Sequence, residues 1–153
     1  MNLTEMGKAA AAAKYEVQKM SASAKNAALL AVADALTGNC GRILEANGRD
    51  VSRAQENGMH PGMVDRLRLT EARVEAMAEG LRQIAGLADP LGEVLDRFTR
   101  PNGLEIEKRR VPLGVIGIIY ESRPNVTADA FGQDGTGDLH PPLLISGHDV
   151  RRG

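Results

Sequence analysis

The sequence has little of several residue types that mark particular classes of protein. Tryptophan is absent and aromatic residues make up 3% of the chain, so the chain lacks the aromatic platforms on which single-stranded nucleic acids stack. The formal net charge is -1, which excludes attraction to nucleic acid or to an anionic membrane through bulk electrostatics. We therefore expect neither a nucleic-acid partner nor a membrane partner.

Cysteine occurs once, at Cys40, so no internal disulfide can form. A lone thiol is typical of a reducing compartment. The first residues alternate alanine with charge instead of forming an apolar leader, and the longest strongly apolar run, residues 113–120, is too short to span a bilayer. These features predict a cytoplasmic protein.

Apolar residues at helical spacing fill the first half of the chain. Ser21 or Ser23 can cap one helix, Asn57-Gly58 can end another, and Thr70 can cap the clearest one. Pro61 can open a short helix that contains Val64 and Leu67. The spacing predicts the longer helices at about 4–19, 23–37, 40–57 and 71–86.

A β-hairpin is predicted at about 93–111. Pro101-Asn102-Gly103 has strong turn chemistry and separates two short segments. The second of these, from Leu104, alternates apolar and charged side chains. The basic run at 108–110 favours a charged strand edge, protected against mispairing, over a binding patch.

Residues 113–120 are apolar without alternation, which predicts a strand buried on both faces of a parallel sheet. A polar stretch follows, and ligands of open α/β sheets bind at the carboxyl ends of strands. The candidate substrate- or cofactor-binding residues are therefore Tyr120, Glu121, Ser122, Arg123 and Asn125. Arg123 either holds a carboxylate or phosphate at two points, or forms a local ion pair with Glu121 or Glu105.

Other chemical motifs are weak. Cys40 has no nearby histidine that could take its proton, so we interpret it as a structural thiol. The three histidines lack metal-ligand spacing, and adding nearby aspartates produces no coordination motif, so we expect no metal site. Gly135-Thr136-Gly137 follows no predicted strand and is interpreted as loop.

The sequence changes character at Gly132. A helix that begins at about 125–131 is abandoned there, and residues 143–145 are too few to assign. The predicted organisation is a domain over 1–131, which includes the hairpin arm at 93–111, followed by a disordered tail over 132–153.

The segment RVPLGVIGIIYESRPNVT, at 110–127, resembles gamma-glutamyl phosphate reductase, also called glutamate-5-semialdehyde dehydrogenase. The resemblance extends backwards through 99–108, 77–83 and 25–30. It covers positions 1 to about 131, roughly the opening third of a family member. The tail from Gly132 does not match, and we expect a broken reading frame there, with a natural divergent terminus as the alternative.

The resemblance implies an α/β fold of the aldehyde-dehydrogenase kind. The chain would supply a helical front, a hairpin and the first strand of a truncated dinucleotide-binding parallel sheet. Residues 1–131 would form part of an NADP-binding-type domain, and the hairpin would join subunits of a homo-oligomer. The implied reaction is reduction of L-glutamyl 5-phosphate by NADPH to glutamate-5-semialdehyde and phosphate, in proline biosynthesis, through a thioester on a cysteine.

The resemblance also implies what this chain lacks. The family's nucleophilic cysteine lies beyond residue 153, Cys40 does not match it, and most of the cofactor site is missing. The segment 120–125 resembles the loop that lines the active-site floor, where Arg123 or Asn125 would aid oxyanion or phosphate binding. We therefore expect no catalytic residue in this chain and no activity from it alone. The alternative function is a non-catalytic interaction module or a split-enzyme fragment.

Overall fold

The structure is a computed structural model that describes residues 2–120, 123–135 and 143–146, the last of these and 133–135 by their backbone only. The first half is helical, as predicted, and each longer helix lies within two residues of its predicted bounds. The helices are α1 (Leu3–Val17), α2 (Ala22–Gly38), α3 (Cys40–Glu56), α4 (Pro61–Leu67) and α5 (Glu71–Ala85).

Polar side chains fix where these helices begin. Asn2 and Glu5 form a reciprocal capping box at α1, with bonds of 2.9 and 3.0 Å. The hydroxyls of Ser21 and Thr70 each accept a backbone N–H at 3.2 Å, at the starts of α2 and α5. The two predicted caps are confirmed.

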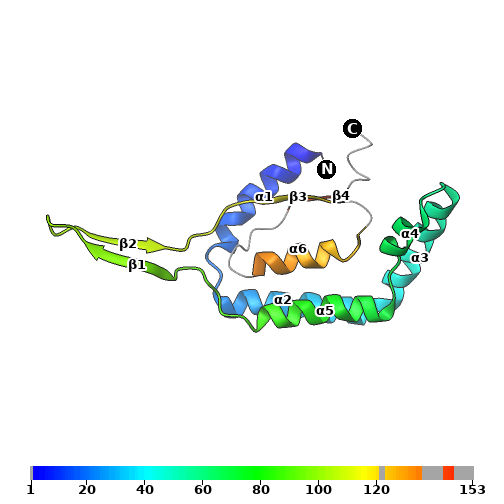
Figure 1. Cartoon of the computed structure of the whole chain (residues 1–153), viewed down its shortest axis with the longest axis horizontal. Coiled ribbons are helices and arrows are strands. Elements are labelled where there is room, and N and C mark those ends of the chain that lie inside the picture. Colours follow the sequence, from blue (N-terminus) through cyan, green and yellow to red (C-terminus); the bar gives the residue numbers. More distant parts are fainter. Residues whose placement is uncertain (1, 121–122, 136–142, 147–153) are drawn as a thin grey trace.

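The core lies between α2 and α5, which run side by side (Figure 1). Leu29 and Ala33 of α2 pack on Ala78 and Leu81 of α5, and each is at most 1% exposed. Partly buried residues surround this cluster, among them Phe131 from the later helix α6 (Val126–Gly135). Burial of a leucine side chain stabilises the fold by about 1.5–3 kcal/mol, so this seam is the main source of hydrophobic stability in the helical front.

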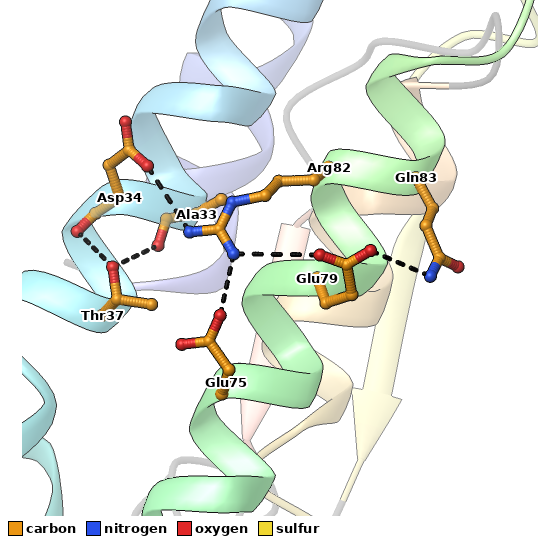
Figure 2. A network of polar contacts seen from close by, with 7 residues as sticks. All are labelled: Ala33, Asp34, Thr37, Glu75, Glu79, Arg82 and Gln83. Atoms are coloured by element: carbon orange, nitrogen blue, oxygen red, sulfur yellow. Dashed lines mark hydrogen bonds and ion pairs between the residues drawn. The ribbon is translucent and has the colours of Figure 1, made fainter.

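A polar network flanks this seam (Figure 2). The Arg82 guanidinium of α5 donates to Glu75 at 2.9 Å and lies 3.6 Å from the Asp34 carboxylate of α2. The hydrogen bond to Glu75 is the main cause of a raised pKa of Arg82. Because the partners are exposed, the network orients α2 against α5 more than it stabilises them.

A buried ion pair joins the start of α2 to the segment after α5. The Lys25 side chain is almost fully buried, and its ammonium donates to Asp89 at 2.8 Å. Burial opposes ionisation of Asp89, but the hydrogen bonds from Lys25 and from the Leu91 amide outweigh it, so the pKa of this carboxyl is lowered. The pair fixes the point from which the chain leaves the helices.

The hairpin is confirmed. β1 (Val94–Thr99) pairs antiparallel with β2 (Glu105–Arg109), and Gly103 in the turn has a φ of 83°, which favours glycine. Arg97 and Glu107 form an ion pair across the strands. The ribbon extends away from the helices (Figure 1). Every residue of its two strands except Ile106 is exposed.

A two-stranded parallel sheet follows, with α6 as its crossover. β3 (Gly117–Tyr120) pairs with β4 (Leu143–Ser146), from Gly117 opposite Leu143 to Tyr120 opposite Ser146. In Figure 1, α6 lies between the strands and the α2–α5 pair, and α1 lies toward the opposite side of the strands. The helical front, hairpin and parallel strands match the predicted α/β fold class.

The predicted strand 113–120 is shortened to β3. Residues before Gly117 have no strand partner in the described part of the chain, and Gly114 has a φ of 111°, outside the range of regular strands. The expectation of burial on both faces is wrong here, since Ile119 is 72% exposed. A strand with one neighbour leaves an edge uncovered.

The prediction that the helix ends near residue 131 is also wrong. α6 continues to Gly135, and Gly132 is buried, so close to α5 that a Cβ on it would lie 2.6 Å from Cδ1 of Ile84. Residues 143–146, which sequence left unassigned, form β4. Both features depend on tertiary contacts that local periodicity does not record. The other residues of the predicted tail, 136–142 and 147–153, lie outside the described residues.

Candidate functional site

A groove of about 420 Å³ lies between the α4–α5 turn and the start of α6. Its volume lies within the range of small-molecule sites. We call it the arginine groove, because four of its lining residues are arginines. It is lined by Asp65, Arg66, Arg68, Leu69, Arg73, Ala76, Met77, Arg123, Pro124, Asn125 and Asp129.

The side of the groove formed by α6 contains two of the predicted site residues, Arg123 and Asn125. The Asn125 amide donates to Asp129 at 2.9 Å, which orients both side chains at the first turn of the helix. Arg123 is exposed and forms no ion pair with any described residue. Its predicted pairing with Glu105 is absent, whereas Glu121 lies outside the described residues.

Tyr120 lies at the end of β3, outside the lining of the groove. Its hydroxyl lies 2.6 Å from that of Thr127, so the phenol is anchored to the first turn of α6. Glu121 and Ser122 are also predicted site residues, but neither lies within the described residues. The predicted set is therefore divided, with Arg123 and Asn125 in one groove and Tyr120 supporting the helix beside it.

The other side of the groove was missed by sequence reasoning. Asn47 of α3 is 8% exposed, and its amide donates to the Leu67 carbonyl at 2.8 Å while its oxygen accepts from the Leu69 N–H at 2.7 Å. The two bonds clamp the backbone on both sides of Arg68. The asparagine lies 20 and 22 positions from its partners, so no local pattern could have revealed them.

Arg73 completes the clamp. Its guanidinium donates to the carbonyls of Asp65 at 2.8 Å and Arg68 at 2.5 Å, and lies 3.6 Å from the Asp65 carboxylate. Arg73 is therefore structural, whereas Arg66 and Arg68 form no ion pair among the described residues. The turn presents the Arg66 and Arg68 guanidinium groups, neither paired with a described acid, on a fixed backbone.

The side chains that line the groove are of a kind suited to binding an anion. Arginines can hold a carboxylate or phosphate in bidentate fashion, and the groove contains neither a cysteine nor a histidine. Cys40 lines a second groove with Thr37, Glu71 and Glu75, which shares no residue with the first. The structure thus separates the Cys40 thiol from the side chains of the arginine groove.

A dinucleotide site does not fit the described residues alone. The sequence between β3 and α6, residues 121–125, contains no glycine, whereas dinucleotide phosphates are bound by glycine-rich turns between a strand and a helix. In the same described ranges, no three acidic, histidine or cysteine side chains gather as a metal site. No single described helix is long and apolar enough to cross a membrane, although α2 and α3, bent by 68°, pass that test as a pair by length and composition.

Curated relatives match most of this chain but only part of their own length. The gamma-glutamyl phosphate reductases of Mesorhizobium japonicum and Brucella anthropi are each 53% identical over 128 residues, 84% of this chain and 30% of theirs. That of Lachnospira eligens is 53% identical over 131 residues, 86% of this chain and 32% of its own. No protein-family model matches.

Solved structures show the same similarity to gamma-glutamyl phosphate reductase. The crystal structure of gamma-glutamyl phosphate reductase from Thermotoga maritima superposes with a TM-score of 0.91 at 39% identity, over 98% of this chain and 36% of the other. The Saccharomyces cerevisiae enzyme gives 0.89 at 29% identity, over 97% and 38%. In sequence and in fold, the chain is a homologue of part of gamma-glutamyl phosphate reductase and spans about a third of its length.

Proposed function

We propose that this chain is part of a catalyst for the NADPH-dependent reduction of L-glutamyl 5-phosphate to glutamate-5-semialdehyde and phosphate. The observation that carries the proposal is the 53% identity to gamma-glutamyl phosphate reductases over 128 residues. The arginine groove is consistent with it, because the substrate is an anion and the groove offers guanidinium groups that form no ion pair with the described residues. A cytoplasmic location accompanies the proposal and is supported by the single cysteine.

The part assigned to this chain is to bind and orient, not to react. Held in a fixed position, an acyl phosphate meets a nucleophile at far higher effective concentration than in solution. Arg123 and Asn125, which line the arginine groove just before α6, would contact the substrate anion. The thiolate and the NADPH site would come from residues outside this chain.

Reconstitution tests the proposal. The chain is refolded with the segment of the Mesorhizobium japonicum relative that lies beyond the matched 128 residues. Glutamate-5-semialdehyde, phosphate and NADP are added, and NADPH formation is followed by absorbance. We expect turnover from the mixture and from neither part alone.

The matched control uses the relative's own 128-residue segment with the same remainder. If that pair forms NADPH and the pair containing our chain does not, then the proposed function is wrong. Turnover with our chain supports it, and substitution of Arg123 by Gln should then lower kcat/KM by about tenfold or more, the usual effect of losing a charge-assisted contact.

A further inference from the structure

The arginine groove contains charges of both signs. Arg66, Arg68 and Arg123 line it without ion pairs to any described residue, and Asp65 and Asp129 line it as well. A site for a simple anion gains nothing from carboxylates, because they repel it. The mixture is typical of a ligand that itself has both charges.

The side of the groove formed by the α4–α5 turn is held by side-chain hydrogen bonds. Asn47 clamps the peptide groups on both sides of Arg68, and Arg73 binds the carbonyls of Asp65 and Arg68. The backbone from Leu67 to Leu69, which carries Arg68, is therefore held by three of these side-chain hydrogen bonds. Such preorganisation lowers the entropy lost on binding a ligand.

On the side of the groove formed by α6, the acidic residue is Asp129. One carboxylate oxygen of Asp129 accepts from the Asn125 amide at 2.9 Å, and the other accepts no side-chain hydrogen bond from a described residue. Arg123 lies two residues before Asn125 and also lines the groove. A ligand in the groove would be stabilised by placing a cationic group near Asp129 and an anionic group near Arg68 and Arg123.

We propose that the arginine groove binds the amino-acid end of an acidic amino-acid substrate. Arg68 and Arg123 hold its α-carboxylate, and Asp129 accepts a hydrogen bond from its α-ammonium group. The identity of the acid, glutamate with an activated side chain, rests on the proposed function. The groove is then a specificity site, and the reacting acyl group points away from it toward the rest of the catalyst.

Equilibrium dialysis of the full chain against radiolabelled L-glutamate tests this binding, whatever the state of association of the chain. Glutarate lacks the ammonium group and 4-aminobutyrate lacks the α-carboxylate, so each should compete at least about tenfold more weakly than unlabelled glutamate. Arg68→Gln and Asp129→Asn should each weaken glutamate binding by about tenfold. Arg53→Gln, an exposed arginine of α3 outside the groove, is the control and should change nothing.

Three results would overturn the inference. Equal competition by glutarate would mean that the groove binds anions without reading the ammonium group. Tighter competition by inorganic phosphate than by glutamate would make it a phosphate site. Absence of glutamate binding, with circular dichroism confirming folded helices, would remove the site. Turnover in the reconstitution experiment decides the proposed function separately, because it can succeed while this dialysis fails and the reverse.

Discussion

Asp89 offers the clearest case of one side chain with a measurable energetic role. Its partner Lys25 is 2% exposed, and removal of one member of a buried pair costs about 3–5 kcal/mol because the other charge is left uncompensated. We expect Asp89→Asn to lower the free energy of unfolding by about that amount at neutral pH, as measured by urea denaturation. Glu45→Gln, which breaks the exposed pair with Arg49, should cost less than about 1 kcal/mol.

The Asp89 carboxyl also makes the free energy of unfolding depend on pH, in a direction set by its lowered pKa. The pKa of Asp89 is lowered in the folded state, so the unfolded chain binds more protons below the ordinary carboxyl range. The stabilisation is present above the unfolded pKa, about 4, and is lost as pH falls through the folded value. The difference in unfolding free energy between wild type and Asp89→Asn should therefore shrink in acid. A difference that stays constant down to acid unfolding would contradict this role.

A substitution at Gly132 tests whether the last residues of α6, beyond the predicted end at 131, belong to the fold. It packs on Ile84 and Leu81, so a larger side chain must displace them. We expect Gly132→Leu to destabilise the chain by about 1–3 kcal/mol, the usual range for overpacking. Gly48→Leu is the control, because Gly48 lies within α3 with no atom within 4 Å of an added Cβ, and should raise stability through helix propensity. Equal, small effects of both changes in thermal melts would mean that α6 does not pack there.

Among the helices and strands, the sequence predicted those whose bounds depend on residues close together along the chain. Helix bounds follow from caps such as Ser21 and Thr70, and the hairpin follows from its turn. What it missed depends on distant partners. β4 exists because β3 lies beside it, α6 extends because Phe131 and Gly132 pack on the core, and the groove turn is held by Asn47. The sequence predicts a site at 120–125, but it does not predict that Arg68 lines the same groove as Arg123, because that depends on the fold.

The hairpin and the edge of β3 predict association of the chain. A two-stranded ribbon is marginal alone in water, and here Leu95 and Phe98 of β1 are exposed, as is Ile119 of β3. We propose that the hairpin joins copies of this chain, and we expect sedimentation to give a species larger than a monomer. Phe98→Lys should shift it toward monomer, because a charge on the ribbon opposes strand pairing. Tyr15→Lys, on the exposed surface of α1, should not.

A compact monomer with a cooperative melt would contradict that expectation. It would mean that the exposed apolar side chains of the ribbon and of β3 are tolerated as ordinary surface. Loss of association on Tyr15→Lys would place the contact on α1 instead of the hairpin.

For the whole molecule, the prediction is that this chain alone does not catalyse reduction of glutamyl phosphate. Catalysis of this kind needs a thiolate held against an acyl carbon and a nicotinamide held over the thioester. The single thiol, Cys40, lies at the start of α3 in a groove that shares no residue with the arginine groove. The described residues contain two parallel strands and no glycine-rich turn between β3 and α6, which is too little to hold a dinucleotide.

The assay is run backwards, because an acyl phosphate is labile. The purified chain is mixed with glutamate-5-semialdehyde, phosphate and NADP, and NADPH is followed by absorbance for wild type and for Cys40→Ser. We expect no turnover from either, since substrate that is bound without a positioned thiolate and without a site that holds NADP beside it cannot pass to the thioester. Turnover that Cys40→Ser abolishes would make Cys40 the nucleophile, and would require the thiol and Arg123 to meet in a different arrangement of α3 and α6. Turnover that survives the substitution would require a route without a thioester.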